Sequence, residues 1–238
     1  MATFNFKSAK PFEEVDKLAL NLQPTEDLMP LRLRWGLRVA KRIVDVLFAL
    51  LFFVCFGWLY LIVALGVLLT SGHPILYSQP RFGRNGKEFR FYKFRSMVPD
   101  AKAVLEDYLK KNPDAEQQWK AYQKLENDPR VTKFGALIRR TSIDELPQFW
   151  NVLIGDMSIV GPRPCMLQQK ELYGTHWEQY CAVRPGITGL WQVSGRNQLS
   201  FEARVQLDAE YVKSLSVSGD IRIFVKTIFV VLTGQGSH

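Results

Sequence analysis

Two adjacent carboxylates, Asp144 and Glu145, lie in the stretch RRTSIDELPQFW, which runs from Arg139 to Trp150. Neighbouring carboxylates can divide the work of a reaction at phosphorus: one attacks as a nucleophile, while the other holds a divalent ion or handles a proton. A nucleophile that attacks a polyanion needs nearby cations, and Arg139 supplies one in the same stretch. The acidic pair is therefore the first candidate for a reaction centre.

The same stretch also permits a purely structural interpretation. Ser142 and Glu145 have the spacing of a helix capping box, and carboxylates in a first helical turn are stabilised by the helix dipole. Pro147 argues against this, because a proline suits the first position of a helix but clashes when it lies further inside. We therefore expect the helix to begin near Pro147. Both acids then lie just ahead of an electropositive helix end, where anions and metals bind.

Basic residues elsewhere have types and positions that suit phosphate. Lys93 and Arg95 alternate along an expected strand, so their side chains face the same way. Arg163 lies between Pro162 and Pro164, and a guanidinium can bind phosphate through two parallel hydrogen bonds. Each residue alone is typical of a solvated surface. Together they indicate a phosphate site.

The overall charge and the absent motifs narrow the function. Lys and Arg number 31 against 23 Asp and Glu, and the net charge of +8 favours an anionic partner. The sequence contains no P-loop, dinucleotide-binding, zinc-protease or serine-hydrolase motif. Its basic residues are scattered, which argues against a nucleic-acid-binding helix. The cysteines, Cys55, Cys165 and Cys181, have no C-x-x-C spacing and predict neither a disulfide framework nor a zinc site.

A long apolar run lies before the candidate site residues and could anchor the chain in a membrane. From Val46 to Thr70 the sequence carries no formal charge, a length of roughly 37 Å as a helix, which is enough to cross a bilayer. Basic clusters flank both ends, and a simple span would place one of them on the non-cytoplasmic side. A re-entrant helix, broken near Gly57 because glycine weakens a helix, removes this conflict. An ordinary single span with an irregular charge pattern remains the alternative.

The rest of the chain predicts an α+β fold with a small antiparallel sheet and interfacial amphipathic helices. We expect a loosely structured arm over residues 1–31, a membrane-inserted helix over 32–73 and a catalytic domain over 74–238. The last helical segment, DIRIFVKTIFVVL, has an apolar surface interrupted by charges. It is expected at a membrane interface, with a core helix as the alternative.

Turn residues divide the catalytic domain into elements. The segments PILYSQ and KEFRFYKF read as two strands, and Asn85-Gly86 between them is a strong hairpin signal. Two surface helices should be separated at Asn112-Pro113, since proline cannot continue a helix.

Four segments carry a resemblance to a known family: KRIVDVLF, FRFYKFRSM, DPRVTKFGALIRRTSIDELPQFWNVLIGDMSIVGPRP and RPGITGLWQVSGRN. They closely resemble the bacterial sugar transferases that act on polyprenyl phosphate, the monotopic phosphoglycosyl transferases. The likeness runs from Lys41 almost to the C-terminus. It is greatest to short exopolysaccharide-initiating members, the undecaprenyl-phosphate galactose phosphotransferases.

The resemblance implies transfer of hexose-1-phosphate, galactose or glucose, from a UDP-sugar to undecaprenyl phosphate, with release of UMP. It implies Mg²⁺ and a covalent phosphosugar intermediate on an aspartate. Asp144 matches the nucleophile and Glu145 its partner and metal ligand. The substrate-binding candidates that the resemblance carries over are Lys93, Arg95, Arg139, Arg163, Asp208 and Arg196.

The implied partners are a UDP-hexose, undecaprenyl phosphate and membrane lipids, without nucleic acid, and an oligomer is compatible with the family. The implied place is the bacterial inner membrane, with the catalytic domain on the cytoplasmic face. The family's membrane helix is broken by a Ser-Pro pair, where this chain has Gly57-Trp58. The alternative function is a non-catalytic membrane anchor that binds anionic lipid or nucleic acid. Such a binder would explain the charge and the apolar run, but it has no need for Asp144 and Glu145.

Overall fold

The computed structural model describes residues 35–122, 125, 127–195 and 199–233 of the 238-residue chain. The chain divides into two compact units, both of which mix helices with short strands. Unit 1 comprises Met1–Lys41, Gly83–Lys87 and Val160–His238, and unit 2 comprises Arg42–Phe82 and Glu88–Ile159. The mixture of helices with a small antiparallel sheet confirms the predicted fold class.

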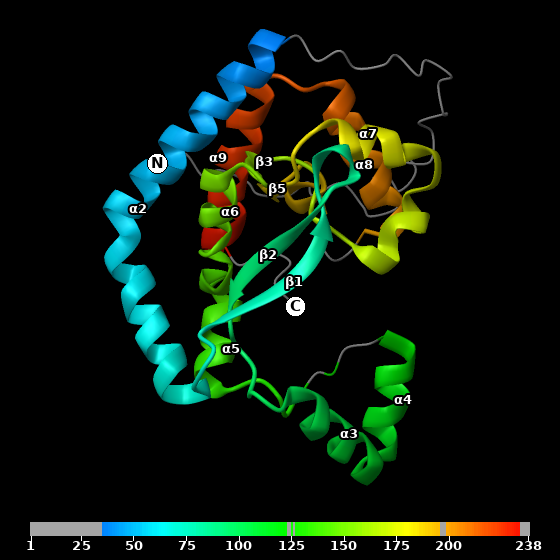
Figure 1. The fold of residues 1–238 in the computed structure, drawn as a ribbon. Coiled ribbons are helices and arrows are strands. Elements are labelled where there is room, and N and C mark those ends of the chain that lie inside the picture. Colours follow the sequence, from blue (N-terminus) through cyan, green and yellow to red (C-terminus); the bar gives the residue numbers. More distant parts are fainter. Residues whose placement is uncertain (1–34, 123–124, 126, 196–198, 234–238) are drawn as a thin grey trace, which may run out of the picture. The chain divides into compact units, whose positions relative to one another are not determined.

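The apolar run forms helix α2, Trp35–Ser71, which among the described residues is the one helix long and apolar enough to cross a membrane. It continues through Gly57, where the sequence predicted a break. Glycine costs a helix only about 1 kcal/mol and keeps its backbone donor, so the hydrogen-bonded ladder survives. Figure 1 shows that α2 instead bends in its middle while remaining helical. The helix ends beside Gly72, close to the predicted end at residue 73. Gly72 has a left-handed φ of 69°.

Helix α2 is buried near its two ends and exposed between them. Its buried residues are Asp45, Ala49, Val63, Val67 and Ser71. Val63 and Val67 pack against Phe94 and Ile138 of unit 2. The large apolar side chains that remain exposed include Leu51, Val54, Phe56, Trp58, Leu61 and Ile62. The middle of α2 therefore presents an apolar surface that would suit contact with lipid.

Strands β1, Leu76–Phe82, and β2, Glu88–Phe94, form the predicted antiparallel hairpin, with Leu76 opposite Phe94 and Phe82 opposite Glu88. The turn follows the sequence signal, since Asn85 and Gly86 have φ values of 61° and 68°. β1 is longer than the strand predicted from PILYSQ, because its pairing with β2 continues past Pro80.

The helices of unit 2 follow the hairpin. They are α3 (Ala101–Lys111), α4 (Pro113–Tyr122), α5 (Lys133–Arg140), the 3-10 turn η2 (Ile143–Glu145) and α6 (Gln148–Ile154), followed by strand β3 (Ser158–Val160). The division at Asn112-Pro113 is as predicted. Thr132 caps α5 by accepting a hydrogen bond from the Gly135 amide at 2.9 Å. A side chain at Gly135 would collide with the Ser96 carbonyl, so α5 lies directly against that backbone.

Unit 1 consists mostly of short elements and two helices. Its elements are η1 (Arg84–Gly86), β4 (Cys165–Met166), η3 (Leu167–His176), α7 (Trp177–Ala182), β5 (Gly186–Thr188), η4 (Trp191–Val193), α8 (Phe201–Lys213) and α9 (Val217–Thr233). Rings of Tyr173, Trp177 and Tyr180 contact one another in its core. α9 exposes Ile221, Val225, Ile228 and Phe229, and its predicted interfacial position stays a prediction.

Candidate active site

A cavity of about 710 Å³ in unit 2 brings together five of the predicted site residues. Strand β2 and the segment after it supply Lys93 and Arg95, α5 supplies Arg139, and η2 supplies Asp144 and Glu145. Other parts of its lining are Tyr77, Ser96, Val98, Lys102, Leu105 and Arg130. Residues far apart in the sequence therefore meet around one space that holds both acids.

The local backbone places the two acids in a turn of their own. Ser142 has a left-handed conformation, with φ 56° and ψ 16°, and within the described part of the chain its hydroxyl caps no backbone amide of η2. The capping-box interpretation is therefore wrong. Helix α6 begins directly after Pro147, as predicted, and the acids stand ahead of it in the 3-10 turn.

Lys93 lies against both acids. Its Nζ is 2.6 Å from Glu145 Oε1 and 3.6 Å from Asp144 Oδ2. Asp144 is only 7% exposed, and burial raises the pKa of its carboxyl above the ordinary value. The charge of Lys93 lowers that pKa, the charge of Glu145 raises it, and the charge of Arg139 lowers it. The ammonium of Lys93 thus offsets part of the electrostatic cost of burying two neighbouring carboxylates.

Two of the arginines at the cavity, Arg95 and Arg139, are each held by a neutral group. Arg139 Nε donates to Ser96 Oγ at 2.7 Å, and Arg95 donates to the His73 carbonyl at 2.9 Å. Hydrogen bonds to neutral oxygens fix each side chain while leaving its positive charge uncompensated by that partner. Such charges suit a polyanionic substrate.

The acidic pair also fits a magnesium ion. Mg²⁺ is commonly held by one or two carboxylates, with substrate phosphate oxygens and water completing the octahedron. In the described part of the chain no group of three or more His, Cys, Asp or Glu residues gathers at one place. Asp144 and Glu145 both line the cavity, so it offers the one or two carboxylates that would suit such an ion.

Two other predicted site residues belong to unit 1. Asp208 is 2% exposed, and its Oδ2 accepts a hydrogen bond from the Tyr173 hydroxyl at 3.2 Å. The guanidinium carbon of Arg163 lies 5.9 Å from the Trp191 ring centre. Burial raises the pKa of Asp208 well above its ordinary value, although the Tyr173 hydrogen bond and the charge of Arg163 act against this. Arg196 lies outside the described residues.

The sequence predictions missed Ser96 and Asn151. Ser96 fixes Arg139, whereas the fully buried Asn151 joins α6 to β2 by accepting from the Tyr92 amide at 3.2 Å and donating to the Arg90 carbonyl at 2.7 Å. The one signal for Asn151 is a polar side chain in the short apolar segment QFWNVLI.

Known proteins match most of this chain. A family model described as bacterial sugar transferase matches residues 36–234. An uncharacterized sugar transferase of Haemophilus influenzae is 46% identical over 201 residues, which cover 84% of this chain and 42% of that protein. The exopolysaccharide production protein ExoY of Rhizobium meliloti is 44% identical over 200 residues, covering 84% of this chain and 88% of its own length.

A Salmonella typhimurium protein named undecaprenyl-phosphate galactose phosphotransferase is 48% identical over 168 residues, which cover 71% of this chain and 35% of that protein. The chain therefore spans less than half the length of two of these relatives and most of the length of the third.

Replacing Asp208 with Asn should remove a pH dependence of stability. The raised pKa means that the folded protein binds the proton more tightly than the unfolded chain, whose Asp pKa is about 3.9. Ionisation of Asp208 therefore lowers the free energy of unfolding of the protein as the pH rises from about 4 toward the folded-state pKa. Relative to wild type, the melting temperature of Asp208→Asn should rise as the pH increases above about 4, the pKa of an unfolded Asp, toward the raised pKa of the folded protein. Thermal unfolding in one detergent measures this.

The matched control is Glu210→Gln, which removes an exposed carboxylate from the same helix and should show no such trend. A difference between Asp208→Asn and wild type that stays constant with pH would contradict the raised pKa.

Proposed function

The chain belongs to the bacterial sugar transferase family, and from this premise we propose that it transfers hexose-1-phosphate from a UDP-hexose to undecaprenyl phosphate. Release of UMP accompanies the transfer, which is the first membrane step in the assembly of an exopolysaccharide or other surface glycan. The observation that carries the proposal is the acidic pair with Lys93 and Arg139 at one cavity. The name of the Salmonella relative supports the lipid acceptor and galactose as one hexose.

In the proposed first half-reaction, a carboxylate oxygen of Asp144 attacks the β-phosphorus of the UDP-hexose. The bond between that phosphorus and the bridging oxygen breaks, and UMP leaves with the oxygen. Hexose-1-phosphate remains on Asp144 as an acyl phosphate, which divides one difficult displacement into two easier ones.

In the second half-reaction, an oxygen of undecaprenyl phosphate attacks the same phosphorus. The acyl phosphate bond breaks, so the hexose-1-phosphate passes to the lipid and the Asp144 carboxylate is regenerated. Attack by water would release the sugar phosphate instead.

The cations of the cavity stabilise the charge that develops during both displacements. Lys93, Arg95 and Arg139 are fixed before substrate arrives, and such preorganised charge is worth more in a partly buried site than in water. Bound Mg²⁺ would neutralise phosphate oxygens, and Glu145 is the residue that would hold it.

We also propose that the protein lies at the bacterial inner membrane, with α2 entering and leaving by the cytoplasmic face. Within unit 2, α2 contacts the rest of the unit at two places, through Asp45 in its first half and through Val63 with Val67 in its second half. Two attachments of one helix to the same globular unit support a topology in which the helix returns to the side of the membrane from which it entered. The path from Ala49 to Val63 is roughly 21 Å at about 1.5 Å per residue, shorter than the bilayer's hydrocarbon core of about 30 Å.

Replacing the nucleophile should abolish turnover without unfolding the protein. Asp144→Asn keeps the shape of the side chain but exchanges the carboxylate for a poorly nucleophilic amide, so UMP release should fall by at least about 1,000-fold, the scale of losing a central catalytic group. Glu145→Gln should also reduce the rate strongly. The measurement is UMP release from UDP-galactose and UDP-glucose with undecaprenyl phosphate and Mg²⁺.

Asp107→Asn is the matched control, because it removes an exposed carboxylate that pairs with its helical neighbour Lys111, away from the acidic pair. It should retain turnover. A near-normal rate for Asp144→Asn would refute the nucleophile, and a wild-type protein inactive with a full panel of UDP-hexoses would refute the proposed reaction.

Removal of the Lys93 charge should move the acidic limb of the pH–rate profile. Asp144 attacks only when ionised, and the charge of Lys93 lowers its pKa against the effect of burial. Lys93→Met should therefore raise that pKa further, so UMP release in the absence of lipid should be lost at a higher pH than in wild type. Lys111→Met, which removes an exposed ammonium, should leave the profile in place. An unchanged acidic limb in Lys93→Met would show that the two groups are not coupled.

The topology can be tested with single cysteines in a variant that lacks Cys55, Cys165 and Cys181. Lys10→Cys and Lys110→Cys should both resist an impermeant thiol reagent in intact cells and react after the membrane is permeabilised, because both lie on the cytoplasmic side in the re-entrant topology. Labelling of either residue from outside intact cells would contradict that topology.

A further inference from the structure

The first turns of α2 bind the segment that follows the acidic pair. In unit 2, the guanidinium of Arg42 donates to the carbonyls of Val152 at 2.5 Å and Leu153 at 2.8 Å. Both carbonyls belong to the last turn of α6, where carbonyls lack the full set of intrahelical partners, and that of Val152 also accepts from the Gly155 amide at 3.1 Å. A cation is also favoured at this end by the helix dipole. Arg42 thus caps α6 from another helix.

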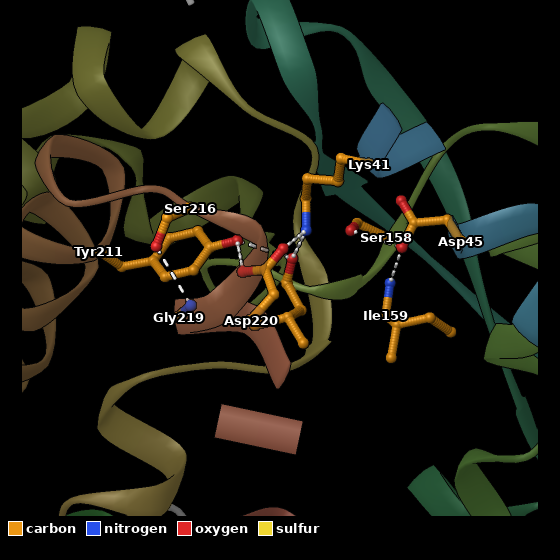
Figure 2. A network of polar contacts seen from close by, with 9 residues as sticks. Lys41, Asp45, Ser158, Ile159, Tyr211, Ser216, Gly219 and Asp220 are labelled. Carbon is orange, nitrogen blue, oxygen red and sulfur yellow. Dashed lines mark hydrogen bonds and ion pairs between the residues drawn. The ribbon is translucent and has the colours of Figure 1, made fainter. Parts of the chain in front are cut away.

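One turn further along α2, Asp45 binds the start of β3. Its Oδ1 accepts hydrogen bonds from Ser158 Oγ at 3.0 Å and from the Ile159 amide at 2.9 Å, as Figure 2 shows. Asp45 is 3% exposed, and a carboxylate buried to this extent is stable only with such partners. Arg42 and Asp45 therefore fix both sides of the connection between α6 and β3.

Helix α6 is held at three levels. Before its first turn, Glu145 pairs with Lys93; in its middle, Asn151 bonds to the backbone of β2; and at its end, Arg42 caps it. A helix from Gln148 to Ile154 is only about 10 Å long at about 1.5 Å per residue, so a movement at its end is passed to its start. The acids precede that start.

The neighbouring Lys41 makes a separate attachment within unit 1. Its Nζ lies 2.8 Å from the Val160 carbonyl and 2.5 Å from Asp220 Oδ2, and Asp220 Oδ1 accepts from the Tyr211 hydroxyl at 2.8 Å (Figure 2). This contact of Lys41 lies within unit 1 and is separate from the contacts that Arg42 and Asp45 make within unit 2.

We propose that Arg42 and Asp45 are positioning residues for the Asp144–Glu145 pair. They act through α6 and the start of β3. The position of the acidic pair therefore depends on α2, the helix that carries the exposed apolar surface. This inference rests on the proposed function. Near-attack geometry makes the effect large, because a displacement of about 1 Å can cost about 100-fold in rate.

Single-turnover release of UMP without lipid tests the proposal, since its amplitude counts competent sites and its rate constant reports their geometry. The donor is UDP-galactose or UDP-glucose, whichever the wild type uses. Arg42→Ala should keep the amplitude and lower the rate constant by about 10- to 100-fold. Arg42→Lys should recover most of the rate, because an ammonium can still donate to a terminal carbonyl of α6.

Asp45 can be tested with a conservative and a disruptive variant. Asp45→Asn keeps an oxygen that accepts from the Ile159 amide and should stay within about 3-fold of wild type, a change of about 0.65 kcal/mol at about 1.36 kcal/mol per tenfold. Asp45→Ala should lower the rate constant as Arg42→Ala does. Ser158→Ala removes one bond to Asp45 and serves if Asp45→Ala does not fold. Lys111→Gln, the loss of an exposed charge on α3, should change nothing.

A reduced amplitude with an unchanged rate constant in Arg42→Ala would mean that Arg42 serves folding alone, and it would overturn the proposal. Equal amplitude and rate would overturn it as well. Wild type that releases no UMP would refute the proposed function instead. Hydrogen exchange then decides the positioning role, because amides of residues 142–146 should exchange faster in Arg42→Ala than in Lys111→Gln, and equal exchange would refute it.

Discussion

One ammonium beside two carboxylates is the interaction on which the rest of this site depends. Asp144 and Glu145 are adjacent, and Asp144 is almost fully buried, so the cavity would favour a neutral carboxyl without a nearby positive charge. Lys93 supplies that charge at 2.6 Å from Glu145 and 3.6 Å from Asp144. A carboxylate that is ionised, partly desolvated and directed into a cavity has the properties of a nucleophile. The same ammonium is placed to neutralise an incoming phosphate.

This arrangement requires precise placement of a strand against a turn. Lys93 comes from β2, whereas the acids come from η2, and each depends on its neighbours for position. Asn151 fixes the distance between β2 and α6, because its side-chain amide satisfies backbone groups of the strand. Arg42 and Asp45 extend the same support to α2. Buried polar side chains therefore hold together elements that apolar packing alone would leave free to slide.

Local signals in the sequence predicted much of the fold. Asn85-Gly86 specified the hairpin turn, Asn112-Pro113 divided α3 from α4, and Pro147 marked the start of α6. Each of these signals acts through the backbone of the residue itself, which is why it can be read without the fold. The alternation of Lys93 and Arg95 likewise predicted that both line one cavity.

Other features depend on contacts between distant residues and could not be predicted. The bonds from Arg42 and Asp45 to residues 152–159 join segments more than a hundred positions apart. Ser142 has the residue type of a cap, yet its left-handed backbone serves to turn the chain before the acids. The continuity of α2 through Gly57 reflects support at both ends of the helix, which outweighs the weak local preference of one glycine.

The role of Asp144 as the nucleophile is tested most directly by mass spectrometry of the protein quenched after mixing with a UDP-hexose and Mg²⁺, without lipid. If Asp144 is the nucleophile, the peptide that contains Asp144 gains the mass of a hexose phosphate, and undecaprenyl phosphate added before quenching removes it. An adduct on another residue, or complete turnover with no adduct under conditions that trap acyl phosphates, would contradict the account.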